Sequence, residues 1–125
     1  MKKAIFFLLA LMVSQVAFGA TPVIHTDPLS VIPTTVVKTS DDVVKSTPGY
    51  VHSIIVTFKG VTIGDEVDLN DNSTAGGATR IRIMADGAYK TVSYVPAAPI
   101  LFPNTGIYCD FTISGGEASA AIQYS

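Results

Sequence analysis

Apolar and polar residues alternate in short runs from Thr34 onward, and no window after residue 19 keeps the spacing of an amphipathic helix. The clearest alternation covers 50–58, where one face is expected to carry His52, Ile54, Val56 and Phe58, and the opposite face Val51, Ser53, Ile55 and Thr57. Further short strands are expected at 34–39, 43–46, 67–70, 80–83, 89–95, 100–102, 107–113 and 118–124.

Turn signals separate these runs at close intervals. Pro48-Gly49 is a turn, Asp86-Gly87 is typical of a hairpin, and Ser114–Glu117 is expected to join the last two strands as a second hairpin. About eight short strands with such turns predict one antiparallel β-sandwich or jelly roll over residues 35–125. The last strand is nearly uncharged, so we expect it to be central in a sheet or covered by a neighbour.

Residues 1–19 have the layout of a secretory signal peptide. Lys2 and Lys3 precede an apolar run over 4–13, and Ala17-Phe18-Gly19 places small residues before a cut at Ala20. The run is too short to span a bilayer comfortably, since a spanning helix needs about 20 apolar residues. We therefore expect an exported protein, periplasmic or extracellular, with no membrane span after cleavage.

Residues 20–34 are expected to form an extended arm rather than a helix. Pro22, Pro28 and Pro33 fix the backbone and remove hydrogen-bond donors at near-regular intervals. The arm has enough Val, Ile and Leu to lie along another subunit, and a disordered linker is the alternative.

The charge balance limits which partners the protein can bind, and the cysteine content shows whether disulfides can hold the fold. All ten acidic residues follow residue 19 and two of the eight basic ones precede it, which argues against nucleic acid and anionic membranes as partners. The chain has a single cysteine, Cys109, and cannot form an internal disulfide, so packing alone must hold the fold. Cys109 shares an alternating face with Ile107, Phe111 and Ile113, so we expect a small buried hydrophobe rather than a reactive thiol or an intermolecular bridge.

The sequence carries no catalytic signature. His25 lies in the arm and His52 in a strand, neither within a motif, and no G-x-S-x-G elbow is present. One cysteine and two distant histidines offer no zinc ligand pair. We therefore expect a non-enzymatic protein with no catalytic, cofactor-binding or metal-binding residues.

Two weaker binding hypotheses stay open. Asp68, Asn70 and Asn72 have the first spacings of an EF-hand loop, but Ser73 and Thr79 occupy its glycine and glutamate positions, so a polar turn is the simpler interpretation than a calcium site. The tyrosines could instead form a surface that stacks on sugar rings; they are Tyr50, Tyr89, Tyr94, Tyr108 and Tyr124.

Several segments together resemble small β-sandwich structural proteins of tailed-phage virions. They are Val36-Val37-Lys38-Thr39, Pro48-Gly49-Tyr50-Val51-His52-Ser53-Ile54, the run from Asp68 to Ala78, Asp86-Gly87 and Ile122-Gln123-Tyr124. The resemblance implies a jelly-roll-like sandwich that assembles on a particle surface, often as a trimer, as a head decoration, fibre or tail component. It implies no catalytic residues, and it gives His52 a structural role.

The leader separates this chain from those virion proteins, which assemble in the cytoplasm and normally lack one. Three origins are compatible with a virion-like domain that carries a leader. The fold could be phage-derived and reused by a bacterium outside the cell, the virus could assemble at or carry a membrane, or a phage could send this protein to the periplasm of its host. The expected function is a structural or surface-display module that oligomerises and contacts other virion or cell-surface proteins. The alternative is a secreted bacterial binding module for a surface carbohydrate or protein.

Overall fold

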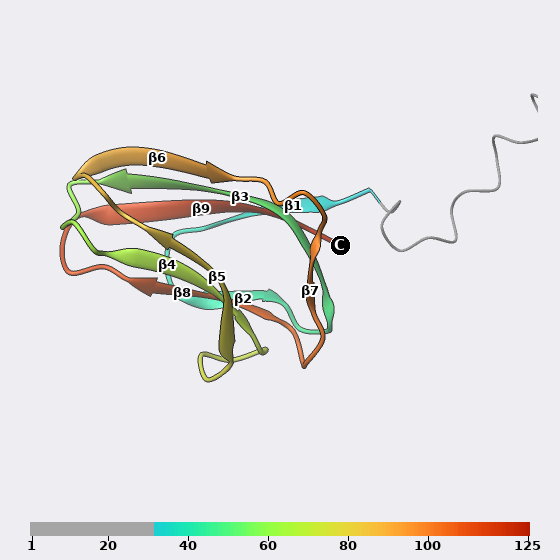
Figure 1. Cartoon of the computed structure of the whole chain (residues 1–125). Helices are drawn as coiled ribbons and strands as arrows, with labels where there is room; N and C mark the ends of the chain where they lie inside the picture. The colour runs from blue at the N-terminus through green and yellow to red at the C-terminus, as the bar shows by residue number, and fades with distance from the viewer. Residues whose placement is uncertain (1–31) are drawn as a thin grey trace, which may run out of the picture. The chain divides into compact units, whose positions relative to one another are not determined.

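Alternating sequence runs become strands throughout the part of the chain that the computed structural model describes, residues 32–125. These residues form nine strands and no helix, and therefore contain no helix able to cross a membrane (Figure 1). The strands are β1 (Thr34–Lys38), β2 (Asp42–Lys45), β3 (Gly49–Lys59), β4 (Glu66–Asp71), β5 (Ala78–Met84), β6 (Tyr89–Tyr94), β7 (Ile100–Phe102), β8 (Ile107–Thr112) and β9 (Glu117–Tyr124). The expected signal peptide and most of the expected arm lie outside the described residues.

The strands form two antiparallel sheets that lie one above the other (Figure 1). Sheet A has the order β1-β9-β3-β6, with β7 pairing the beginning of β3, and sheet B has the order β2-β8-β4-β5. Both sheets contribute to one hydrophobic core between them. Its largest buried side chains include Phe58, Phe102, Ile54 and Ile122 from sheet A, and Leu69, Ile107, Val67 and Cys109 from sheet B. The all-β, sandwich-like prediction is therefore confirmed.

The strand pairs are nested along the chain. The first strand pairs with the last (β1 with β9), β2 pairs with β8, β3 with β6, and β4 with β5. Only β4 and β5 are neighbours in both sequence and sheet, so the turn over 72–77 is the hairpin of the described region. Most pairings therefore join segments that are far apart in the sequence.

The predictions that Asp86-Gly87 and Ser114–Glu117 form hairpins are wrong. Asp86-Gly87 joins β5 of sheet B to β6 of sheet A, and 114–116 joins β8 of sheet B to β9 of sheet A. A Gly-containing turn signals that the chain reverses direction, but it does not specify whether the returning strand pairs or crosses to the facing sheet about 10 Å away.

The predicted faces of β3 are wrong at its beginning because the strand contains a β-bulge. Val51 is opposite Tyr124 and Ser53 is opposite Gln123, so His52 is an extra residue on this strand. An extra residue reverses the alternation. Val51 is consequently buried with Ile54 and the rest of the core face, whereas His52 is only half-buried.

The prediction that the last strand is central is confirmed. β9 lies between β1 and β3, so both of its edges are hydrogen-bonded. Ala118, Ala120 and Ile122 are buried on its inner face. A strand without protective charge is thereby kept from acting as a template for another chain.

Candidate functional site

His52 lies in the bulge of β3 and contacts the final residue of the chain. Its Nε2 is 2.9 Å from the hydroxyl oxygen of Ser125. The backbones of Tyr50 and Ser125 exchange two further hydrogen bonds of 3.0 and 2.9 Å, which hold Ser125 beside the bulge. Within residues 32–125 no carboxylate lies at hydrogen-bonding distance of the ring, so the arrangement lacks the third member of a nucleophilic triad. His25 lies outside the described residues.

Cys109 is fully buried in β8, as expected of a small hydrophobe. The thiol is free, and burial, followed by the negative charge of Asp41, raises its pKa to about 12. The thiolate is the nucleophile and the metal ligand, so a thiol with this pKa is inert at neutral pH.

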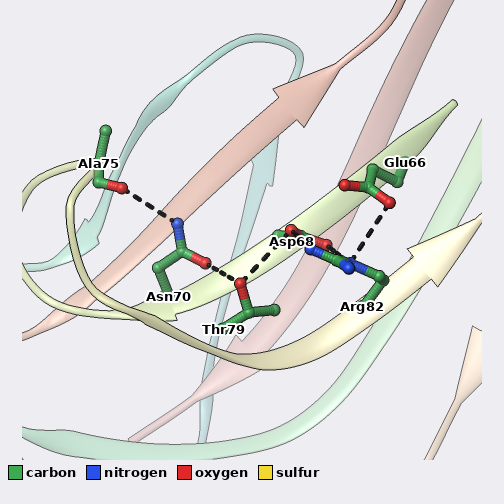
Figure 2. Close-up of polar contacts among 6 residues, drawn as sticks. All are labelled: Glu66, Asp68, Asn70, Ala75, Thr79 and Arg82. Atoms are coloured by element: carbon green, nitrogen blue, oxygen red, sulfur yellow. Dashed lines mark hydrogen bonds and ion pairs between the residues drawn. The ribbon is translucent and has the colours of Figure 1, made fainter.

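The three side chains with EF-hand-like spacing bind protein groups in two different places. Asp68 and Asn70 both accept hydrogen bonds from the hydroxyl of Thr79, at 3.5 and 3.0 Å (Figure 2). Asn72 instead accepts one of 2.7 Å from the hydroxyl of Thr105, in the turn after β7. Within residues 32–125, no group of three or more His, Cys, Asp or Glu side chains is arranged so that it could hold a metal ion.

Two buried aspartates near this region fasten loops. Asp71 accepts a hydrogen bond of 2.9 Å from the backbone N–H of Asn104 and an ion-paired one of 3.3 Å from Arg80. Asp65 accepts from the backbone N–H groups of Thr62 and Ser114, at 3.0 and 3.2 Å, and from the Ser114 hydroxyl at 2.9 Å. The bond from Thr62, supported by Ser114, lowers the pKa of Asp65. Sequence reasoning missed these roles because each aspartate has a partner in a distant segment.

The outer face of sheet B is rich in charge. Arg82 donates to both carboxylate oxygens of Asp68, at 3.0 and 2.8 Å, and its Nε is 3.3 Å from Glu66 (Figure 2). Asp110 lies directly opposite Asp68 on the neighbouring strand. Partial burial, with the negative charges of Asp41 and Asp68, raises the pKa of Asp110. This face therefore carries more carboxylates than the single guanidinium of Arg82 can neutralise.

The outer face of sheet A is largely uncharged. One cross-strand row consists of Val37, Ala121, Ile55 and Ser93, and the next contains Ser119, Thr57 and Thr91. Val37 is 61% exposed and Ile55 is 42% exposed. Charge returns only at the following row, where Lys59 is opposite both Glu117 and Tyr89. We call the two uncharged rows the neutral face.

A shallow hollow borders the neutral face where β1 ends at Lys38 and the adjoining strands continue. It has a volume of about 440 Å³ and is lined by Thr39, Thr57, Lys59, Glu117, Ala118 and Ser119.

The tyrosines do not gather on one surface. Tyr89 and Tyr94 are 78% and 39% exposed and lie at the two ends of β6. Because they are five positions apart in a strand, an odd number, their side chains point to opposite faces. Tyr124 packs against the core.

No protein-family model, curated protein sequence or solved structure matches this chain. The chemistry of the described surface therefore carries the functional argument. The exposure of Ile55 could be predicted from the sequence, because Ile55 alternates with buried residues. Its position in one row with Val37 and Ala121 could not, because that depends on how the strands pair.

Proposed function

We propose that this protein is an exported, non-enzymatic structural module that oligomerises and is displayed on a particle or cell surface. The neutral face carries this proposal. It places the exposed Val37 and Ile55 in one row with no charged side chain, on a chain of formal net charge −2. Contiguous exposed apolar surface on a soluble domain is typical of a contact with another macromolecule.

The internal chemistry of the domain supports the same proposal. Every fully buried side-chain nitrogen and oxygen within residues 32–125 has a hydrogen-bond partner. The His52 ring contacts Ser125, Cys109 is inert, and the buried aspartates fasten loops. These groups have structural roles, whereas an enzyme needs polar groups that converge on an open site.

The finer fold assignment in this proposal is a jelly roll. It is supported by the nested pairing of β1 with β9, β2 with β8, β3 with β6 and β4 with β5, divided between the two layers. Jelly rolls are common in capsid and lectin domains. The resemblance to small virion proteins of tailed phages points in the same direction and favours a trimer.

The proposal includes removal of residues 1–19 as a signal peptide. Expression of the full chain with fractionation should place the protein in the periplasm or medium, and mass spectrometry should give a first residue of Ala20. Light scattering of this exported form should show a mass above that of one chain. A monodisperse monomer at every concentration contradicts the oligomeric module, and an intact leader in the cytoplasm contradicts export.

A secreted binding module for surface carbohydrate is the second candidate. The hollow that is lined by Lys59, Glu117 and hydroxyl side chains favours it, because the exposed Tyr89 is opposite Lys59. Sugar sites commonly combine an aromatic ring with polar side chains. Binding on a glycan array that is lost in Tyr89→Ala and kept in Tyr94→Ala supports this function, and an array without hits contradicts it.

A further inference from the structure

The two outer faces of the domain differ in their ability to meet a copy of themselves. Sheet B carries Glu66 and Asp110 beside the buried Asp68, and Arg82 offsets only part of their charge, so two such faces brought together add acidic charge to acidic charge. Like charges placed opposite each other across an interface disfavour association. The neutral face has no such penalty, because its two rows contain only apolar, alanine and hydroxyl side chains.

The side chains of the neutral face are also short enough for close packing of sheets. Ala121 lies at the centre of its row, between Val37 and Ile55, and Ser119 occupies the same strand in the next row. Facing sheets in proteins pack about 10 Å apart through interdigitated side chains of this kind.

The area of the neutral face sets the expected strength of the contact. The two rows cover about 14 Å along strands that lie about 4.8 Å apart, which over four strands gives roughly 270 Å² per copy. Specific interfaces commonly bury about 800 Å² per partner, and weak, reversible ones bury less. The face therefore suits a weak, reversible dimer.

We infer that the occupant of the neutral face is the same face of a second copy, so that two sheets A pack together about a twofold axis. This inference rests on the proposed function and specifies its first contact. A face that meets itself closes with two copies, so the unit it builds is a dimer rather than the trimer that the virion resemblance implies.

The test compares a charge placed in this face with an identical charge placed on the other sheet. Ile55→Lys and Met84→Lys each replace an exposed apolar side chain on a strand, 42% and 53% exposed respectively. Sedimentation equilibrium of the exported chain should show a concentration-dependent dimer. Ile55→Lys should weaken the dimer by about 100-fold or more, because each copy then buries one lysine in an interface that has no carboxylate to pair with it. Met84→Lys should leave the dimer unchanged. Matching thermal melts of the two variants exclude unfolding as the cause.

Crosslinking supplies a second measurement that does not depend on introducing charge. Ala121→Cys should form a covalent dimer with a bismaleimide of about 10 Å reach, whereas Met84→Cys should not, and the buried Cys109 should stay unlabelled in both. An oligomer that survives Ile55→Lys and gives no crosslink in the Ala121→Cys variant overturns this inference and leaves the proposed function standing. A monomer at all concentrations overturns both.

Discussion

The carboxylate of Asp71, at the end of β4, accepts a hydrogen bond of 2.9 Å from the backbone N–H of Asn104, thirty-three residues further along the chain. The side chain of Asn104 also donates to the backbone carbonyl of Asp71, at 3.3 Å. These contacts tie the end of sheet B to the turn that leads from β7 into β8. The tie joins the two layers at one end of the sandwich.

Replacing this carboxylate should destabilise the domain. We expect Asp71→Ala to lower the free energy of unfolding by about 2 kcal/mol, because the backbone N–H of Asn104 and the guanidinium of Arg80 both lose a buried acceptor. Urea denaturation followed by circular dichroism measures the change. Asp86→Ala is the control, since Asp86 makes a 3.5 Å surface ion pair with Lys90 and its removal should cost less than about 0.5 kcal/mol.

Two neighbouring glycines should respond very differently to alanine. Gly116 has a φ of +73°, and a Cβ there would collide with the backbone of Gly60, whereas a Cβ on Gly115 would meet nothing within 4 Å. We expect Gly116→Ala to cost about 2 kcal/mol or more and Gly115→Ala to be nearly neutral. Equal thermal melting temperatures for the two variants would contradict the close approach of the two turns.

The thiol of Cys109 should be protected from alkylation until the protein unfolds. Its pKa of about 12 in the folded state exceeds the ordinary 9.0, so at pH 8 a maleimide should label it only after guanidinium is added. The folded state also holds this proton more tightly than the unfolded chain does. Stability should therefore fall as the pH rises above about 9, and Cys109→Ala should remove that part of the fall.

Asp65 and Asp110 should impose opposite pH dependences on stability. The pKa of Asp65 is lowered in the folded state, so its contribution is present above about pH 3.8 and is lost as the pH falls below that value. The pKa of Asp110 is raised, so stability should increase as the pH falls from neutrality through that pKa toward 3.8. Melting temperatures across pH 3 to 8 measure both.

Replacing each aspartate by the uncharged asparagine separates these two pH dependences. Asp110→Asn should stabilise the protein at pH 7 by about 0.5 kcal/mol, because it removes one of two carboxylates directly opposite each other. Asp65→Asn should destabilise it at pH 7 and flatten the loss of stability in acid. A destabilised Asp110→Asn at pH 7 would contradict the predicted relief of repulsion between Asp110 and Asp68.

Local alternation was sufficient to locate the strands, because side-chain period and turn residues act over a few neighbours. The segment Ile100–Phe102 was predicted with its observed bounds, and β8 ends one residue before the predicted Ile113. Pairing could not be predicted in the same way, because Asp86-Gly87 has the same local chemistry whether the chain reverses within a sheet or between sheets.

The bulge at His52 shows a second limit of local reasoning. The beginning of β3 pairs with β7 and its end pairs with β6, and the extra residue separates these two segments. No residue near His52 indicates where β3 changes its partner strand. Simple alternation therefore predicted the wrong face for Val51. The neutral face was likewise hidden, since Val37 and Ile55 become neighbours only through β9.

Nested pairing has a consequence for how the chain is made and moved. Val37 pairs with Ala121, so β1 has no partner until nearly all of the polypeptide has been synthesised. Contacts this distant in sequence form slowly, since a long loop must close before they contribute. During translation β1 therefore leaves the ribosome before its partner strand exists, and the export proposed above requires a chain in this unfolded state.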